Sequence, residues 1–392
     1  MRIAVAVGGT DRGRSGISTY VRALLPRLQA GLEAEGGQLI AFGGAEDLAT
    51  YEGELRRAET AVTCNRGPGL DAAWHLLRAG AFAEKLGADV LLLPAANRRL
   101  TAFSRVPTVA VVHDLAQLKV PEKFDPLRMF YATRVLPGAL RTATELVAVS
   151  EATRRDLCGA LHVKRERIRL VPNGVDAARF LPASGDDDRI DRARVATGLV
   201  GPYLLYMSRL EHPGKNHLRL LRAFAGSAAA RTHVLALAGA DFGAAAAVRS
   251  EIARLHLGDR VSVLGFVADD LLPGLVAGAD AVAMVGLYEG FGLPALEAIA
   301  AGRPVVASAT GALPEVVGRF AAMCDPLSVG SISTALDRAI ADPQLRASVA
   351  AEGPAWAAAR GWDRTASGIL DACFSARLQS RLPQPATFRV SN

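Results

Sequence analysis

Short runs of Val, Ile, Leu and Ala alternate with longer segments of helical periodicity from one end of the chain to the other. Such uninterrupted apolar runs are typical of strands buried on both faces of a parallel sheet, so they predict an α/β fold. The first series of predicted strands is Arg2–Val7, Gln38–Phe42, Asp89–Leu93, Thr108–His113, Glu145–Ser150 and Arg169–Val171. The second series is Tyr203–Ser208, His233–Ala238, Val261–Leu264, Ala281–Val285, Pro304–Ala307 and Ala322–Cys324.

A stretch rich in Pro, Gly and Asp, Leu181–Arg189, separates the two series and reads as an interdomain linker. We therefore predict two Rossmann-like domains in tandem, residues 1–183 and 184–361. Residues 362–392 should form a C-terminal helix and tail, with the helix at Trp362–Leu378 packing back across the interface. Ligands of open α/β sheets bind outside the carboxyl ends of the strands, so the interdomain cleft is the expected site.

Composition narrows the class of protein. The chain has 392 residues, 50% hydrophobic and 21% charged, which suits two globular domains and excludes a disordered chain. We find no apolar run of about 18–20 residues that would span a bilayer, and no secretory cleavage site. The four cysteines lie far apart without a CxxC motif, which indicates neither a disulfide framework nor a zinc site. We expect a reduced, cytoplasmic protein.

The net charge of +6 lies entirely in the first half of the chain. Residues 1–181 hold 25 Lys and Arg against 19 Asp and Glu, whereas residues 182–392 hold 20 of each. A basic domain can face an anionic membrane surface or a phosphorylated acceptor, or can simply have a basic solvated surface. Nucleic acid is disfavoured as a partner, because no zinc-finger, RRM or basic-region pattern is present.

Two candidate features follow predicted strands of the first half. Gly13–Ser18 precedes a helix, where glycines let a ligand approach the backbone and the helix N-terminus offers N–H groups to an anion. The segment is not GxGxxG and no acidic residue ends the strand at Phe42, which disfavours a dehydrogenase-type dinucleotide site; a plain tight turn is the alternative. His113-Asp114 ends another strand and is either a hydrogen-bonded histidine at the sheet edge or a functional one.

Two cations, Arg209 and Lys215, stand six residues apart in a loop between a strand and a helix. A planar guanidinium and a compact ammonium at this spacing could clamp a diphosphate. The chain has 40 Arg and five Lys, and Lys215 is the only lysine after Lys164, which suggests that this position needs an ammonium. The alternative is a pair of surface charges.

Two carboxylates, Glu289 and Glu297, flank the turn Gly290–Gly292. Pro294 suits the first helical position, which puts Glu297 in the first turn of the helix. A buried carboxylate there can accept hydrogen bonds from two vicinal hydroxyls, as a ribose presents, while Glu289 would face a second polyol and the helix end a phosphate. Helix capping alone would explain Glu297, but not the whole pattern.

The motifs Glu289-x7-Glu297, within Glu-Gly-Phe-Gly-Leu-Pro, and Arg209-x5-Lys215-Asn216 resemble those of the retaining nucleotide-sugar glycosyltransferases of family 4, which have the GT-B fold. Further matching segments are Gly13–Gly16, Val112–Leu115, Val149–Thr153, Val171–Asp176 and Leu313–Gly318. The resemblance covers about residues 1–375. It departs from the family at Arg14-Ser15, where a second glycine is common, and this bears on the tightness of that loop.

The resemblance implies a role for each matched residue. Arg209 and Lys215 would hold the donor diphosphate and neutralise the charge that grows on it as the glycosidic bond breaks. Glu297 would bind the ribose, Glu289 the transferred sugar, and His113 the sugar near the reaction centre. The implied catalytic residues are His113, Arg209, Lys215 and Glu289. The implied donor-binding residues are Gly16, Arg209, Lys215, Phe266, Val267, Glu289, Gly290, Phe291, Gly292, Leu293 and Glu297.

The resemblance also implies retention of the anomeric configuration by front-face attack, with the leaving phosphate taking the acceptor proton. No hydrolase-type carboxylate pair is then required. We expect no metal and no cofactor besides the donor substrate. Asp186-Asp187-Asp188 imitates the DxD of metal-dependent transferases but lies in the linker rather than after a strand, so we interpret it as solvated charge. His212 and His217 do not have zinc-ligand spacing, and no G-x-S-x-G indicates a serine hydrolase.

The acceptor is expected on the basic first domain. Pro126–Pro137 places aromatic and aliphatic residues beside arginines, as an amphipathic helix at a membrane interface does, and as an ordinary buried helix also does. Many relatives act on lipid-linked acceptors. We therefore expect a nucleotide-sugar donor, a glycan or glycolipid acceptor, and peripheral contact with the cytoplasmic face of a membrane.

These features together predict a retaining hexosyltransferase that builds a polysaccharide or lipid-linked glycan, with mannose favoured by the resemblance. The alternatives are a catalytically idle GT-B module that scaffolds a polysaccharide assembly complex, a sugar-nucleotide epimerase and a glycogen-type phosphorylase. A phosphorylase needs a lysine for pyridoxal phosphate, and Lys215 already has a role at the diphosphate. The nucleotide base, the acceptor and the oligomeric state stay open.

Overall fold

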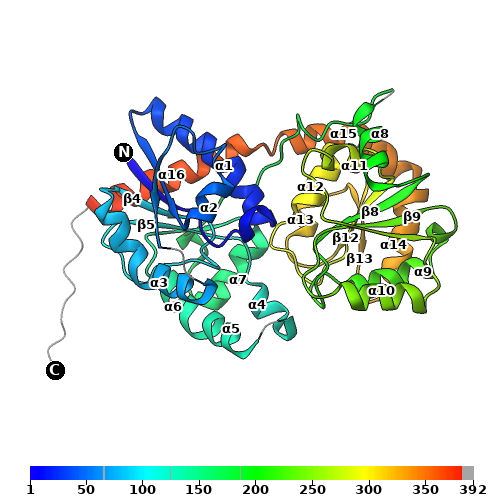
Figure 1. Ribbon diagram of the computed structural model, residues 1–392, viewed down its shortest axis with the longest axis horizontal. Coiled ribbons are helices and arrows are strands. Elements are labelled where there is room, and N and C mark those ends of the chain that lie inside the picture. Colours follow the sequence, from blue (N-terminus) through cyan, green and yellow to red (C-terminus); the bar gives the residue numbers. More distant parts are fainter. Residues whose placement is uncertain (65–66, 124, 186, 382–392) are drawn as a thin grey trace.

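The computed structural model describes residues 1–64, 67–123, 125–185 and 187–381, which form two domains side by side, each with one parallel sheet (Figure 1). The first sheet has the order β3-β2-β1-β4-β5-β6-β7 and consists of β1 (Arg2–Ala6), β2 (Gln38–Gly43), β3 (Glu59–Val62), β4 (Val90–Leu93), β5 (Thr108–Val112), β6 (Glu145–Ala148) and β7 (Ile168–Leu170). The second has the order β10-β9-β8-β11-β12-β13 and consists of β8 (Tyr203–Met207), β9 (Val234–Ala238), β10 (Val261–Gly265), β11 (Ala281–Met284), β12 (Val305–Ser308) and β13 (Ala321–Cys324). The predicted α/β fold of two Rossmann-like domains is confirmed.

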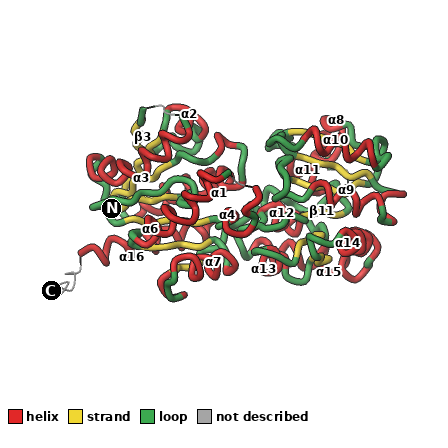
Figure 2. The backbone as a smooth tube through the Cα atoms, turned by 90° about the horizontal axis from the view of Figure 1, so that it is seen from below, coloured by secondary structure: helices red, strands yellow, loops and turns green. Residues whose placement is uncertain are grey.

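Helices cover the sheets of both domains (Figure 2). Those of the first domain are α1 (Gly16–Ala34), α2 (Ala45–Thr50), α3 (Pro68–Lys85), α4 (Ala116–Lys119), α5 (Pro126–Phe130), α6 (Leu136–Arg141) and α7 (Glu151–Leu161). Those of the second are α8 (Asp188–Thr197), α9 (His217–Ala225), α10 (Ala245–Arg254), α11 (Leu272–Ala277), α12 (Leu293–Ala300), α13 (Leu313–Val317), α14 (Val329–Ala341) and α15 (Pro343–Ala358), and the last helix is α16 (Trp362–Arg381). Because strand side chains alternate, Ile3 and Val5 of β1 enter one core while Ala4 and Ala6 enter the other.

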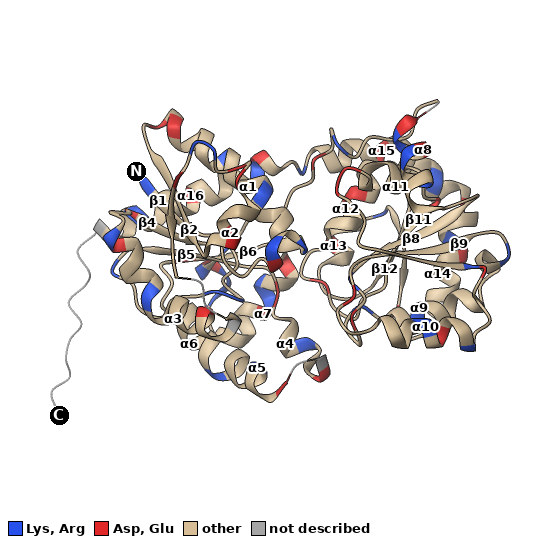
Figure 3. Ribbon diagram, viewed as in Figure 1, with Lys and Arg blue, Asp and Glu red and all other residues tan. Residues whose placement is uncertain are grey.

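The predicted strands all appear, with ends within two residues of the prediction. The strand that the pattern did not predict is β3, with the sequence Glu-Thr-Ala-Val at the edge of the first sheet. Its side chains are exposed or half-buried, so it carries no apolar run of the kind that marks the inner strands. Acidic and basic residues lie mainly on helices and loops (Figure 3). Within the described ranges, we find no helix with the length and apolar character needed to cross a bilayer.

The last helix, α16, packs on the first domain although it follows the second in sequence (Figure 1). Ile369, Ala372 and Cys373 are fully buried there. At its outer edge, Ser375 Oγ donates a hydrogen bond of 2.8 Å to Glu145 Oε1 at the start of β6, and Arg377 pairs with Asp89 at 3.1 Å. The first domain is therefore built from two separated segments of the chain. The predicted frayed tail, Pro383–Asn392, lies outside the described residues.

The chain crosses between the domains twice, and the two crossings touch. Val175 N donates to the carbonyl oxygen of Arg360 at 2.9 Å. A Cβ atom added to Gly174 would lie 2.5 Å from Trp362 N and 2.7 Å from Gly361 C, both backbone atoms. The two crossings can pack this closely because residue 174 has no side chain.

We predict that Gly174→Ala lowers the free energy of unfolding by about 1–3 kcal/mol or more, the usual cost of forcing atoms into a packed site. Urea denaturation, followed by circular dichroism, measures it. Gly159→Ala is the matched control: this glycine lies within α7, nothing stands within 4 Å of an added Cβ, and alanine should be neutral or slightly stabilising. Equal stability of the two variants would contradict close packing at the crossing.

Candidate active site

A cleft of about 820 Å³ lies between the domains, at the carboxyl ends of strands from both sheets. Its walls include every residue that the sequence analysis placed in the site: Gly16, His113, Arg209, Lys215, Phe266, Val267, Glu289, Gly290, Phe291, Gly292, Leu293 and Glu297. Segments nearly 300 residues apart in sequence thus share one cavity.

Lys215 and Glu289 form the central ion pair of the cleft. Lys215 Nζ lies 2.8 Å from Glu289 Oε1 and 3.0 Å from Oε2, and both side chains are largely buried. The ammonium, with three donors, keeps hydrogen-bonding capacity for a further acceptor in the cleft. The geometry provides a fixed positive charge with a carboxylate that orients it.

The loop that carries Lys215 is held in place by its neighbour, Asn216, which is buried and has φ = 59°. The Asn216 side-chain amide donates to the carbonyl oxygens of Val285 at 2.9 Å and Pro326 at 2.7 Å. Asparagine tolerates this left-handed conformation better than most residues, because its side chain is short and polar. Asn216 therefore ties the β8–α9 loop to the loop after β11, which bears Glu289.

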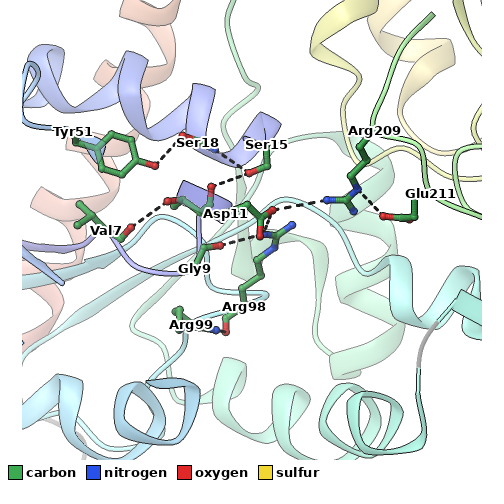
Figure 4. A network of polar contacts seen from close by, with 11 residues as sticks. Val7, Gly9, Asp11, Ser15, Ser18, Tyr51, Arg98, Arg99, Arg209 and Glu211 are labelled. Carbon is green, nitrogen blue, oxygen red and sulfur yellow. Dashed lines mark hydrogen bonds and ion pairs between the residues drawn. The ribbon is translucent and has the colours of Figure 1, made fainter. Parts of the chain in front are cut away.

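Arg209 belongs to a polar network that crosses the cleft (Figure 4). Its Nε lies 2.6 Å from Glu211 Oε2, and its Nη1 lies 3.8 Å from Asp11 Oδ2 of the first domain. Asp11 in turn accepts a hydrogen bond of 2.5 Å from Arg98. The guanidinium also stacks over Phe242, 4.9 Å from the ring centroid. These contacts orient the Arg209 guanidinium group at the cleft wall.

His113 is 6% exposed and meets the second domain at its backbone. Its Nε2 lies 2.8 Å from the carbonyl oxygen of Pro94, and burial lowers its pKa to about 4, so the ring is neutral with Nε2 protonated and Nδ1 an acceptor. A Cβ on Gly290 would lie 2.0 Å from the carbonyl oxygen of His113, so only glycine permits this approach of the domains. Thr153 Oγ1 lies 3.1 Å from the same oxygen and 3.4 Å from that of Gly290.

Glu297 faces the cleft from α12, and burial raises its pKa to about 7, opposed in part by Arg179. Within the described ranges its side-chain carboxyl forms no hydrogen bond or ion pair. The predicted place in the first turn is wrong: the helix begins at Leu293, with Gly292 at the N-cap, so Glu297 lies one turn further in. Arg179 itself pairs with Asp269 at 2.9 Å.

The remaining predicted residues line the ends of the cleft. Gly16 opens α1 behind an N-cap by Ser15, and a Cβ on Gly16 would be 3.7 Å from Leu293 of the other domain. Phe266, 62% exposed, and Val267 follow β10 on the second domain. Phe291 and Leu293 are buried.

In the acidic run of the linker, Asp188 is exposed, as predicted for solvated charge, but Asp187 is not. Asp187 caps α8 and has a side chain that is 6% exposed, paired with Arg189, which lowers the pKa of that carboxyl. The interpretation of Asp187 as solvated is therefore wrong, because the start of α8 needs an acceptor. Asp186 lies outside the described residues. Among the described residues, no group of three or more His, Cys, Asp or Glu is arranged to hold a metal ion.

Comparisons with known proteins show the family of the chain. The model for Glycosyltransferase Family 4 matches residues 14–179, and the model for Glycosyl transferases group 1 matches residues 187–356. The chain belongs to the group 1 glycosyltransferases of family 4. The predicted membership, based on the Glu289-x7-Glu297 and Arg209-x5-Lys215 motifs, is confirmed.

Two sequence relatives and one solved structure are similar to this glycosyltransferase. The chain is 33% identical over 207 residues to the MMP alpha-(1->4)-mannosyltransferase of Mycolicibacterium hassiacum, covering 52% of this chain and 47% of that protein. It is 28% identical over 391 residues to the O-antigen chain mannosyltransferase B of Escherichia coli, covering 95% and 99%. Anabaena HepE, solved in complex with UDP-glucose, has the same fold, with a TM-score of 0.75 at 22% identity over 96% of this chain and 100% of that one. The chain spans 47–63% of the length of three curated relatives that it matches.

Several residues of the glycosyltransferase site were not found from the sequence. Asp11, Arg98, Arg179 and Asp269 all contribute charges at the cleft or beside it. Arg98 lies five residues after the predicted strand Asp89–Leu93, and this position near the carboxyl end of a strand could have indicated a site residue. Asp11 follows the predicted strand Arg2–Val7 by four residues and so carries the same signal, but its contact with Arg209 exists only when the two domains meet.

The raised pKa of Glu297 predicts a stability that depends on pH. Between about pH 4.5 and 7 the unfolded chain ionises this carboxyl while the folded protein keeps it protonated, so the folded protein loses stability as the pH rises. Glu297→Gln removes that loss. We expect the variant to match the wild type near pH 4 and to be more stable by about 1–3 kcal/mol at pH 8, measured by urea denaturation at both values. A constant difference across this range would contradict the shifted titration.

Proposed function

We propose that the protein is a retaining, metal-independent hexosyltransferase that moves a sugar from a nucleoside diphosphate to a glycan or lipid-linked glycan acceptor. The observation that carries the proposal is the Lys215–Glu289 pair beside Arg209, at the carboxyl ends of strands in an interdomain cleft. Family membership supports glycosyl transfer, and the cation pair supports a diphosphate as the leaving group.

The two cations would act on charge that develops during the reaction. As the bond between the sugar carbon and the diphosphate oxygen breaks, negative charge grows on the leaving phosphate. Arg209 and Lys215, already oriented by Glu211 and Glu289, would stabilise that charge without reorganisation. The acceptor hydroxyl then bonds to the same face of the sugar carbon and gives its proton to the leaving phosphate oxygen, which accounts for retention.

The other residues would place the donor. The neutral His113 can accept a hydrogen bond from a sugar hydroxyl at Nδ1, and Glu289 can accept from sugar hydroxyls while it holds Lys215. Glu297, without a partner among the described residues, would accept the ribose hydroxyls. The exposed Phe266 offers an aromatic face to the base, and backbone atoms of Gly290–Leu293 would lie along the sugar.

Mannose remains the favoured sugar, because two of the named relatives are mannosyltransferases. The solved complex of Anabaena HepE holds UDP-glucose, so both GDP and UDP donors belong in the test. Titration with each nucleotide also separates the proposal from the idle scaffold. Binding of neither nucleotide would favour the scaffold.

The predicted amphipathic segment Pro126–Pro137 consists of α5, a π-helical turn at Tyr131–Val135 and the start of α6. Pro137 lacks an N–H, which accounts for the wider turn before it. Leu127 is 77% exposed and Phe130 59%, beside the exposed Arg128, whereas Ala132 and Leu136 are buried. We propose that Leu127 and Phe130 insert into the headgroup region of an anionic membrane near the acceptor.

Lys215→Ala should lower turnover by about 10²-fold or more, the scale of losing a leading contact to the transition state. It should also weaken binding of the preferred nucleotide, GDP or UDP, measured by calorimetry with a chelator present. Lys85→Ala, which removes an exposed lysine on α3, is the control and should change neither quantity. Near-normal turnover of Lys215→Ala, or a strict metal requirement of the wild type, would contradict the mechanism.

Replacing Leu127 and Phe130 together by serine should reduce binding to vesicles of mixed zwitterionic and anionic phospholipid about tenfold or more, since two large apolar side chains no longer leave water. Co-sedimentation measures the bound fraction. Val195→Ser removes an equally exposed apolar residue from α8 in the second domain and should bind as the wild type does. A wild type that does not bind such vesicles would exclude this part of the proposal.

A further inference from the structure

Two segments that resemble the family, Val149–Thr153 and Leu313–Gly318, contribute no residue to the cleft wall. The structure brings them together across the domain interface. Glu315 of α13, in the second domain, accepts hydrogen bonds from the backbone N–H groups of Glu151 at 3.0 Å and Ala152 at 2.9 Å, in the first domain. One carboxylate thus joins the two segments.

The contact provides a hydrogen-bond acceptor for two backbone N–H groups at the start of α7. The first N–H groups of a helix have no acceptor within the helix. In α7, Ser150 Oγ accepts from the N–H of Thr153 at 3.0 Å. The N–H groups of Glu151 and Ala152 bond to Glu315, whose negative charge also suits the positive end of the helix. The helix cap is therefore completed from the other domain.

The helices on both sides of this contact, α13 and α7, are also hydrogen-bonded to the backbone of predicted site residues. The turn that opens α13 touches Glu289, because the N–H of Ala312 donates to the carbonyl oxygen of Glu289 at 2.9 Å. On the other side, Thr153 of α7 bonds to the carbonyl oxygen of His113. Tyr288, next to Glu289, adds a hydrogen bond from its hydroxyl to Asp156 of α7. Glu315 thus lies in the part of the domain interface that links the backbone at His113 to the backbone at Glu289.

We infer that Glu315 is a positioning residue for sugar transfer: by capping α7 from the second domain, it holds His113 of the first domain at a fixed place relative to the Lys215–Glu289 pair. The inference rests on the proposed function, since it concerns the same reaction. It assigns a role to a residue that touches neither donor nor acceptor.

The test compares Glu315→Ala and Glu315→Gln with Glu352→Ala, which removes a carboxylate paired with Arg319 on the surface of the second domain. Four quantities are measured: kcat and KM with saturating donor, the dissociation constant of the free nucleotide, and hydrogen exchange of the backbone amides, both at the start of α7 and throughout the second domain. Glu315→Ala should lower kcat about tenfold, which corresponds to about 1.4 kcal/mol, and should speed exchange at Glu151 and Ala152. The nucleotide dissociation constant should stay within twofold, because the proposed nucleotide contacts lie in the second domain.

Glu315→Gln, which keeps one oxygen acceptor, should lie between the wild type and Glu315→Ala, and Glu352→Ala should match the wild type. Unchanged kcat in Glu315→Ala would overturn the inference and leave the proposed function standing. Parallel loss of nucleotide binding and of protection throughout the second domain would also overturn it, because Glu315 would then support that domain's fold. A wild type that transfers no sugar would instead remove the proposed function, and the positioning role with it.

Discussion

The approach of two backbones, at the carbonyl group of His113 and at Gly290, determines how the domains meet. No side chain stands between them, and Thr153 bonds to both carbonyl oxygens. The elements that bear the site lead away from this point: on one side His113 directly follows β5, and on the other the loop from β11 to α12 carries Glu289. The shape of the cleft therefore depends on a contact that contains no ionisable group.

Three cations of the cleft are each paired with a carboxylate, Lys215 with Glu289, Arg209 with Glu211, and Arg179 with Asp269. A partly buried cation without a counter-ion would be costly, because burial removes its hydration. Glu297 is the contrasting case, since it lacks such a partner and holds its proton more tightly. The site thus combines cations that have a paired carboxylate with one carboxyl, that of Glu297, that has no paired charge.

Periodicity predicted the inner strands and the two domains, and motif spacing with the family resemblance predicted twelve of the residues that line the cleft. These features have local signals: an apolar run for β1 or β8, and a fixed spacing for Arg209 and Lys215. The edge strand β3 was not predicted, because its Glu-Thr-Ala-Val sequence lacks the apolar run that marks a buried strand. The roles of Asp11, Glu315 and Tyr288 were not predicted, because their partners lie in the other domain. The pattern of one segment contains no information about a surface that only folding brings next to it.

The placement of α16 has a consequence for the order of folding during synthesis. The ribosome releases the strands of the first sheet early, but α16, which covers their apolar face with Ile369 and Cys373, is released only after the whole second domain. The second domain, residues 188–358, is continuous and can complete its core sooner. The first domain therefore lacks one of its packed helices until α16 has been synthesised, and the apolar surface that α16 covers stays exposed until then.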